Sequence, residues 1–154
     1  MKHEEVLAAI RDVKDFPVEG IIFKDITTVL SNPEYLKWMK DEIVNLYRAY
    51  GITKVVGIES RGFILGPAVA MDLGAGFVPV RKPGKLPAET IEVSYAKEYG
   101  VDTIQIHADA LCEDDVVLLH DDLLATGGSM AAALELVRKF NVKKVYISFI
   151  IELD

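Results

Sequence analysis

The sequence is poor in the features that mark secreted and membrane-inserted proteins. Its 154 residues include one cysteine, Cys112, which excludes an internal disulfide and is typical of a reducing compartment. No apolar run approaches the ~20 residues that a membrane-spanning helix needs. Residues 1–16 place acidic side chains among apolar ones and lack the apolar core of a signal peptide. We therefore expect a soluble, cytoplasmic protein with no membrane association.

Basic residues are outnumbered by acidic ones. The chain has 17 lysines and arginines against 24 aspartates and glutamates, which gives a net charge of −7. This balance argues against broad electrostatic binding to nucleic acid or to an anionic membrane. A small anionic ligand is still compatible with it, because local donors decide such binding. Two glycine-containing loops that follow apolar strands hold four of the cations: Arg61, Arg81, Lys82 and Lys85.

The sequence does contain a regular alternation of apolar strands and helices from Lys54 onward. Hydrophobic residues make up 51% of the chain, enough for the core of one domain over residues 1–154. Strands that are apolar throughout, separated by helices, predict an α/β fold with a mainly parallel central sheet flanked by helices. The expected strands are 55–58, 77–80, 116–119 and 145–153, and the expected helices are 63–72 and 130–140. Such sheets bind ligands beyond the carboxyl ends of their strands.

The N-terminal third predicts two helices. Residues 3–14 carry apolar side chains at helical spacing, which indicates a short amphipathic helix. Asn32 is a typical helix cap and Pro33 a typical first helical residue. Helical spacing of apolar residues then continues until Gly51, which supplies a stop.

The alternation breaks between the second and third expected strands. Residues 81–90 hold two prolines and a glycine, while 92–95 and 103–107 predict a short antiparallel pair. A long excursion inside a compact domain is usually a lid or a binding loop. We therefore expect a flexible lid loop at about residues 81–107.

The strongest motif is VVLLHDDLLATGGS, residues 116–129. An apolar strand leads to Asp121 and Asp122, and a turn of small residues then precedes a helix. Turn N–H groups and the positive end of a helix favour a phosphate, although this turn alone is equally typical of an ordinary helix cap. The paired carboxylates favour the ligand site over the ordinary cap. Two charges beside a buried strand cost free energy of desolvation unless a hydroxyl or a metal ion pairs with them. The motif therefore indicates a ribose phosphate.

This segment resembles the phosphoribosyl pyrophosphate (PRPP) signature of the type I phosphoribosyltransferases. The resemblance implies that Asp121 and Asp122 hold the ribose 2′- and 3′-hydroxyls. It also implies that the 5′-phosphate lies among five turn residues: Ala125, Thr126, Gly127, Gly128 and Ser129. His120 stands where the family more often has an aliphatic residue, and a packed histidine is the expected reading.

The segment Glu59-Ser60-Arg61-Gly62-Phe63 again follows a strand and begins a helix. An arginine guanidinium can donate to two phosphate oxygens, and Ser60 adds a neutral donor. In isolation an arginine at such a place is more often a surface residue. The segment resembles the pyrophosphate loop of the same enzymes, and its Ser-Arg-Gly-Phe is typical of the adenine-specific branch. The resemblance implies that Ser60 and Arg61 bind PRPP and that Arg61 takes part in catalysis.

The lid carries a further motif, RKPGKLP at residues 81–87, followed by Glu98 and Tyr99. By composition alone it is more typical of a solvated basic loop. It resembles a hallmark of the adenine-specific branch, however. That resemblance implies that Arg81, Lys82 and Lys85 attend the pyrophosphate. It implies that Glu98 and Tyr99 close over the reacting centre, with Glu98 the candidate for proton transfer with adenine.

Residues 16–27, FPVEGIIFKDIT, form an apolar cluster that can simply pack the N-terminus onto the body. They also resemble the small N-terminal hood of the family, at about residues 1–30 here. The resemblance implies that the backbone near Ile22 and Lys24 reads the edge of adenine and that Phe23 stacks on the ring. Glu19 stands where a proline is common.

The resemblance covers about residues 16–153 and implies a reaction. Adenine and PRPP give AMP and pyrophosphate through a transition state that resembles an oxocarbenium ion, with no covalent nucleophile. Mg²⁺ is expected as the cofactor, held mainly by the substrate rather than by protein ligands. The family also implies a homodimer. Relatives usually continue past the last strand, whereas this sequence ends at Asp154, and we expect the difference to expose apolar surface and to lower stability or weaken the dimer.

Two alternatives stay open on the sequence. One is a phosphoribosyltransferase for another purine base, because only the hood and the lid argue for adenine. The other is a non-catalytic regulator that senses PRPP. A regulator of that kind usually carries a DNA-binding module and a basic face, and the acidic balance of this chain argues against it.

Overall fold

The computed structural model describes residues 2–97, 100–124 and 128–152, and the side chains of 122–124 and 150–152 lie outside that description. The chain divides into two compact units, one up to Glu42 and one from Ile43 onward. The division falls within a helix. The expectation of a single domain over residues 1–154 stays a prediction. Among the described residues, no helix is long and apolar enough to cross a membrane.

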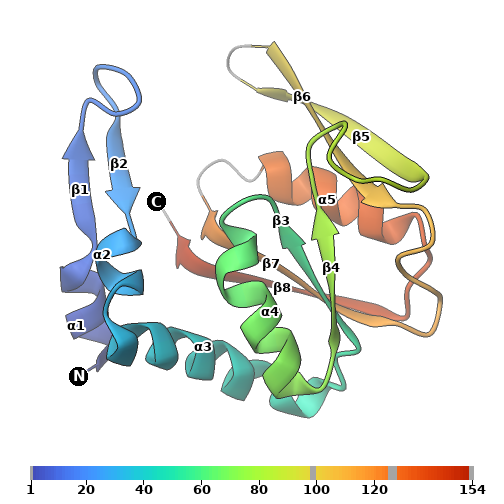
Figure 1. Ribbon diagram of the computed structural model, residues 1–154, viewed down its shortest axis with the longest axis horizontal. Helices are drawn as coiled ribbons and strands as arrows, with labels where there is room; N and C mark the ends of the chain where they lie inside the picture. The colour runs from blue at the N-terminus through green and yellow to red at the C-terminus, as the bar shows by residue number, and fades with distance from the viewer. Residues whose placement is uncertain (1, 98–99, 125–127, 153–154) are drawn as a thin grey trace. The chain divides into compact units, whose positions relative to one another are not determined.

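The N-terminal unit contains an antiparallel hairpin (Figure 1). Its elements are helix α1 (Lys2–Ala9), strands β1 (Arg11–Lys14) and β2 (Ile22–Asp25), and helix α2 (Thr27–Leu30). The predicted helix over 3–14 is therefore wrong beyond Ala9. Residues 11–14 pair with β2 instead, where Val13 lies opposite Phe23. Cross-strand pairing overrides the helical spacing, which α1 retains for only two turns.

Helix α3 (Pro33–Tyr47) begins as the sequence predicts. The Asn32 side chain accepts hydrogen bonds from the backbone N–H groups of Glu34 and Tyr35, at 3.0 and 3.3 Å. These bonds satisfy two of the amides that a helix start leaves unpaired. A short 3₁₀ helix, η1 (Arg48–Tyr50), tightens the last turn, and Gly51 ends it with a φ of 67°. Glycine adopts that left-handed conformation without a steric penalty.

The larger unit is built on a four-stranded parallel sheet in the order β4-β3-β7-β8. This confirms the predicted α/β architecture. The strands and the helices between them are β3 (Lys54–Ile58), α4 (Gly62–Leu73), β4 (Gly76–Val80), β7 (Val116–Leu124), α5 (Gly128–Arg138) and β8 (Lys144–Glu152). Strand β7 is longer than predicted, because it continues through Asp121 and Asp122 and pairs with β8 along its length.

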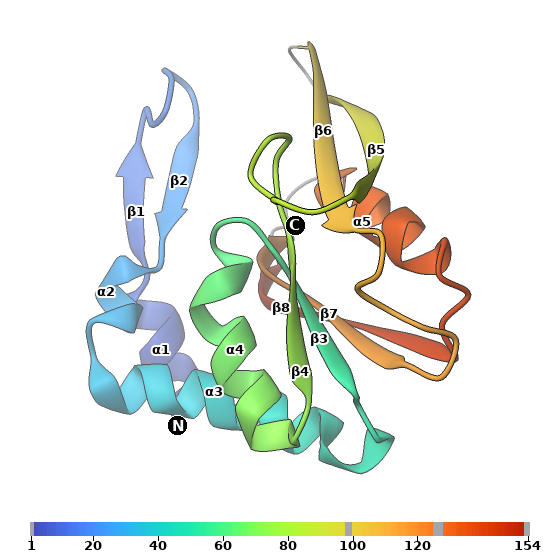
Figure 2. The same ribbon diagram turned by 45° about the vertical axis from the view of Figure 1, so that its right-hand side comes forward.

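Different elements cover the two faces of the sheet (Figures 1 and 2). Helix α4 lies against one face of β3, β4 and β7. The other face packs against α5 and against a hairpin of β5 (Thr90–Lys97) and β6 (Gly100–His107). That hairpin is the predicted antiparallel pair, with more residues in each strand than expected. Its inward-facing residues Val93, Ile104 and Ile106 join the main hydrophobic core.

Candidate functional site

Three strand ends bring polar segments to one edge of the sheet. β3 pairs in parallel with both β4 and β7, so the carboxyl ends of all three meet there. The segment after β3 begins with Glu59, whose backbone N–H donates to the Val80 carbonyl at 2.9 Å. Arg81 follows β4 directly, and Asp121 lies near the end of β7. The arrangement confirms that this edge gathers the polar residues that follow the strands.

Two glycines allow the backbone to pack closely beneath this edge. A Cβ atom at Gly57 would lie 2.7 Å from the Gly62 carbonyl oxygen and 2.8 Å from the Phe77 ring. A Cβ atom at Gly62 would lie 2.9 Å from the His120 carbonyl oxygen. All three distances are shorter than normal contacts allow, so only glycine fits at these two positions. The start of α4 is thereby held against β3 and β7, and the intervening loop carries Ser60 and Arg61; the Glu59–Ser60 peptide in that loop is cis.

Glu59 organises the cations that follow β4. Its Oε1 accepts a hydrogen bond from Arg81 Nε at 3.0 Å and one from the Lys82 backbone N–H at 3.3 Å. Burial acts to raise the pKa of the Glu59 carboxyl, but these two bonds and the charges of Arg81 and Lys85 outweigh it and lower that pKa. Glu59 is therefore ionised at neutral pH. Arg81 and Lys82 contact this carboxylate, and the charge of Lys85 acts on it; their role in binding pyrophosphate stays a prediction.

The backbone of Arg81 is also fixed. Arg81 and Gln105 form an antiparallel bridge, with N–H to carbonyl distances of 3.0 and 2.7 Å. The guanidinium carbon lies 5.8 Å from the centre of the Phe63 ring, within the range of a cation–π contact. The first lid cation is therefore anchored to β6 and to α4, while Lys82 and Lys85 have exposed side chains.

A second cluster lies on the β5–β6 hairpin around Asp102. Its Oδ2 contacts Lys82 Nζ at 3.3 Å, Tyr95 Oη at 3.4 Å and Lys97 Nζ at 3.5 Å. Burial favours a higher pKa for Asp102, but the two lysines lower it. Burial is the main cause that raises the pKa of the Tyr95 hydroxyl. The negative charges of Asp102 and Asp121 raise it further. The charge of Asp121 on β7 thus acts on the Tyr95 hydroxyl of this cluster.

The remaining predicted residues divide into two groups. Ser60 is exposed in the loop before α4, and Gly128 and Ser129 are half-buried in the first turn of α5. Their placement is compatible with the predicted roles without testing them. The residues Glu98, Tyr99, Ala125, Thr126 and Gly127 lie outside the described residues, as does the side chain of Asp122.

The N-terminal unit holds the predicted adenine-reading residues on β2. The side chain of Ile22 is exposed, and Phe23 makes an edge-to-face contact with Phe16 at 5.2 Å between ring centres. Lys24 Nζ donates to Asp12 Oδ1 at 2.6 Å across the hairpin. The side chain of Lys24 is thus engaged within its own sheet, as expected if its backbone carries the recognition.

Asp25 connects the hairpin to α2. One carboxylate oxygen accepts hydrogen bonds from the Thr27 backbone N–H at 2.9 Å and the Thr27 hydroxyl at 2.6 Å. The other accepts from the Arg11 guanidinium, with Nε at 3.0 Å. The Thr27 bonds, then the Arg11 bond, lower the pKa of Asp25 to about 2. Asp25 therefore stays ionised and fixes the end of β2.

His120 is buried in the middle of the sheet, with 1% of its surface exposed. It lies between Gly57 of β3 and Ser148 of β8. Neither ring nitrogen has a hydrogen-bond partner among the described residues. Burial lowers the pKa of the imidazole to about 4, so the ring is neutral at physiological pH. This agrees with the expectation of a packed rather than a catalytic histidine.

Sequence reasoning missed three residues that organise the site: Glu59, Tyr95 and Asp102. The signal for Glu59 is its place directly before Ser60 and Arg61, in a loop that the sequence predicts to bind an anion. Asp102 becomes significant only through the register of the hairpin, in which it lies opposite Tyr95. That register appears only in the pairing of β5 with β6, and no sequence motif encodes it.

Comparisons with known proteins give the same class of protein as this geometry. A model of the phosphoribosyl transferase domain matches residues 25–152. The adenine phosphoribosyltransferase of Bacteroides fragilis is 63% identical over 153 residues, which is 99% of this chain and 86% of that protein. The chain therefore belongs to the phosphoribosyl transferase family.

Solved structures narrow the assignment. The adenine phosphoribosyltransferase of Rhodothermus marinus matches with a TM-score of 0.92 at 52% identity, covering 99% of this chain and 86% of that one. The enzyme from Giardia lamblia, solved with 9-deazaadenine, matches with a TM-score of 0.94 at 46% identity over the same shares. Within the family, this chain is a member of the adenine phosphoribosyltransferases.

Proposed function

We propose that this chain joins adenine to the ribose of PRPP and releases AMP and pyrophosphate, a reaction of purine salvage. The bond from the anomeric carbon to the pyrophosphate oxygen breaks as a bond from that carbon to N9 of adenine forms. The observation that carries the proposal is the gathering of Arg81, Lys82 and Lys85 around Glu59, at the edge of the sheet near which Asp121 lies on β7. Cations and a diol-binding carboxylate at one edge suit a ribose that bears a diphosphate.

The cations act on the leaving group. Bond breaking develops positive charge on the ribose and negative charge on the pyrophosphate, so the transition state resembles an oxocarbenium ion. Arg61, Arg81, Lys82 and Lys85 stabilise the departing charge, and Ser60 adds a neutral donor. Because Arg81 is held by Glu59, β6 and the Phe63 ring, little reorganisation is needed at that position during the reaction.

The acids and the turn hold the rest of PRPP. Asp121 and Asp122 accept hydrogen bonds from the 2′- and 3′-hydroxyls, which fixes the ribose relative to the diphosphate. The segment from Ala125 to Ser129, at the N-terminus of α5, receives the 5′-phosphate through backbone N–H groups. The residues of that segment are Ala125, Thr126, Gly127, Gly128 and Ser129.

The base is bound by β2 and activated by the lid. The backbone near Ile22 and Lys24 reads the edge of adenine, and Phe23 stacks on the ring. Glu98 takes the proton that N9 loses, and Tyr99 closes over the reacting centre. Engagement of the Lys24 side chain by Asp12 supports recognition by the backbone.

Mg²⁺ is proposed as the cofactor, bound to the oxygen atoms of PRPP. Magnesium prefers oxygen ligands and is commonly held by substrate phosphates. The part of the chain that the structure describes contains no group of three carboxylate, imidazole or thiol side chains suited to hold an ion. The positively charged side chains around Glu59 would attract a diphosphate and repel a bare metal ion. When bound, the ion supplies further positive charge to the leaving pyrophosphate.

The proposal also includes a homodimer in the cytoplasm. The dimer is the family expectation, and light scattering coupled to gel filtration tests it: a mass near twice 17.0 kDa supports it, and 17.0 kDa contradicts it. A cytoplasmic location suits the exposed free thiol of Cys112, which a reducing compartment preserves.

The decisive experiment measures pyrophosphate release from PRPP and Mg²⁺ with adenine, hypoxanthine, guanine or xanthine offered separately. Release with adenine alone is expected. Release with another base instead keeps the reaction class but overturns the role of β2. Retained PRPP binding with no release for any base supports a PRPP-sensing regulator in place of an enzyme.

A further inference from the structure

Asp102 engages a residue that PRPP would need. Its Oδ2 lies 3.3 Å from Lys82 Nζ, and Lys82 is one of the cations assigned above to the pyrophosphate. The contact joins the segment after β4 to β6 of the hairpin. Lys82 therefore has an anionic partner within the protein.

The geometry of this contact indicates that a ligand can displace Asp102 from Lys82. Oδ2 of Asp102 is shared by Lys82, Tyr95 and Lys97 at 3.3, 3.4 and 3.5 Å, all longer than an optimal hydrogen bond. The lysine side chains are about half exposed, at 53% and 48%, so water and ligands reach them. The Arg81–Glu59 contact, at 3.0 Å with both groups more buried, is tighter.

Asp102 and a bound diphosphate would compete for the positive charge of Lys82. Asp102 carries one negative charge, whereas a diphosphate carries several and has more acceptor oxygens, so a diphosphate at Lys82 displaces the carboxylate. Once displaced, Asp102 is a like charge beside the ligand. It therefore opposes binding of the diphosphate twice, first by occupying Lys82 and then by repulsion.

We propose that Asp102 is an internal counter-ion that competes with the diphosphate for Lys82 and thereby weakens binding of PRPP and speeds release of pyrophosphate. The inference rests on the proposed pyrophosphate role of Lys82. Asp102 is a residue that sets affinity through Lys82, not one that touches the reacting atoms. In the empty enzyme it keeps Lys82 oriented toward the hairpin.

The main test is Asp102→Asn, with the dissociation constant of Mg²⁺-pyrophosphate measured by calorimetry and its release rate by stopped flow. Loss of a partly exposed ion pair of this kind corresponds to roughly a two- to fivefold change in a binding constant. We expect pyrophosphate to bind that much more tightly and to leave more slowly. An Asp102 with a purely structural role predicts the opposite sign, because a loosened hairpin binds ligand less well.

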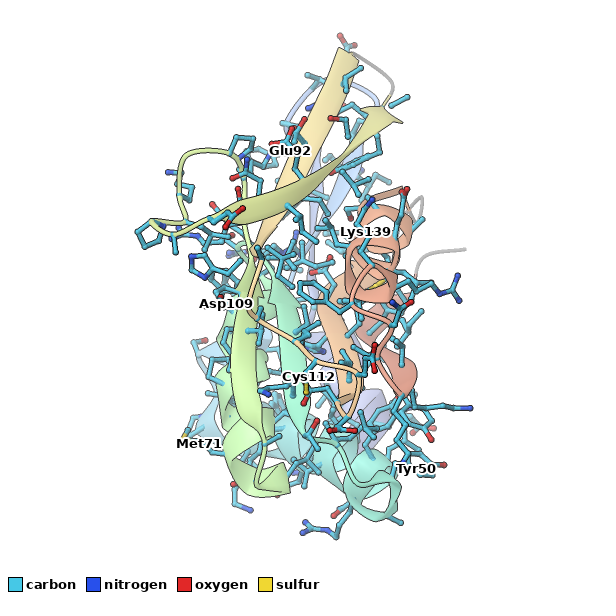
Figure 3. All side chains as sticks on the ribbon, turned by 90° about the vertical axis from the view of Figure 1, so that its right-hand side faces the viewer. Tyr50, Met71, Glu92, Asp109, Cys112 and Lys139 are labelled. Carbon is cyan, nitrogen blue, oxygen red and sulfur yellow. The ribbon has the colours of Figure 1, made fainter. Side chains whose placement is uncertain are left out.

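The matched control is Glu92→Gln. Glu92 lies on β5 of the same hairpin (Figure 3) and accepts a hydrogen bond from Gln105 at 2.8 Å. The substitution removes the same charge from the same hairpin without touching Lys82. We expect pyrophosphate affinity to stay unchanged, and an equal tightening in this variant overturns the proposal by reducing the effect to net charge.

Lys82→Met separates this inference from the function on which it rests. If Lys82→Met leaves pyrophosphate affinity unchanged, the proposed role of Lys82 is wrong. If it weakens binding but Asp102→Asn does not tighten it, the counter-ion proposal is wrong and the role of Lys82 stands. In the double variant, most of the tightening from Asp102→Asn is expected to vanish. A purely structural effect of that substitution would persist there.

Discussion

Asp122 and its neighbour Asp121 are assigned to the ribose hydroxyls by resemblance to known enzymes, and substitution tests that assignment. Asp122→Asn keeps the shape of the side chain but removes its charge and one acceptor oxygen. A hydrogen bond to a charged group contributes about 1.5–3 kcal/mol, so PRPP affinity should fall by roughly 10- to 150-fold. Isothermal titration calorimetry with PRPP measures the dissociation constant of each protein. Unchanged affinity for PRPP would show that Asp122 does not bind the ribose hydroxyls.

His120 makes the stability of the fold depend on pH. Its pKa is about 4 in the folded chain against an ordinary 6.5, because burial disfavours the charged ring. The unfolded chain therefore binds a proton first as the pH falls. Stability is full above about pH 7 and declines as the pH drops through 6.5 toward 4, by up to about 3 kcal/mol in total.

Replacement of His120 by valine should remove this dependence. Free energies of unfolding from urea titrations at several pH values between 4.5 and 8 give the comparison. We expect His120→Val to gain stability relative to the original chain as the pH falls below 6.5. A difference between the two proteins that stays constant across the range would show that His120 does not titrate on unfolding.

At the scale of elements, the close approach of β3, α4 and β7 depends on Gly57 and Gly62. Gly57→Ala would place a methyl group 2.7 Å from the Gly62 carbonyl and against the Phe77 ring. Overpacking of this kind typically costs about 1–3 kcal/mol. Thermal unfolding should show the loss, and Gly76→Ala is the control, since its Cβ would meet only the flexible Lys54 side chain at 3.3 Å. Equal losses in both variants would argue against a special role for Gly57.

The hairpin of the N-terminal unit depends on Asp25 at the end of β2. Asp25→Asn weakens the bonds to Arg11 and Thr27 that fix the strand carrying Phe23 and Lys24. We expect the KM for adenine to rise several-fold while the KM for PRPP changes little. Asp12→Asn is the control, because it breaks only an exposed ion pair with Lys24, which contributes little. A parallel rise in both KM values would point to general destabilisation instead.

Sequence patterns predict the elements of the larger unit and the start of α3 well, but they miss the hairpin of the N-terminal unit. Buried parallel strands such as β3 are recognised in the sequence as apolar runs, and their order along the chain limits the possible topologies. The sequence predicts a helix for residues 11–14 because so short a segment fits both the helical and the strand period, and only pairing with β2 decides between them. The candidate site shows the same division, since a motif indicates the proposed cations, whereas the place of Asp102 depends on the hairpin register.

On the scale of the whole molecule, the net charge of −7 contrasts with a site for a highly anionic substrate. We therefore expect binding to come from local geometry: the proposed cations Arg81, Lys82 and Lys85 lie around Glu59, while acids elsewhere dominate the total charge. This separation favours a small ligand over a polyanion, because nucleic acid needs cations spread along a surface.

A PRPP-sensing regulator that acts on DNA would need a surface that binds DNA, which this charge distribution disfavours. In an electrophoretic mobility assay at about 50 mM salt, the chain should not retard duplex DNA, with or without PRPP. Low salt is the most permissive condition, because released counterions favour any nonspecific binding there. Retardation that appears or disappears on addition of PRPP would support a regulator. Turnover of adenine in the same preparation, without retardation, would assign the PRPP site to catalysis.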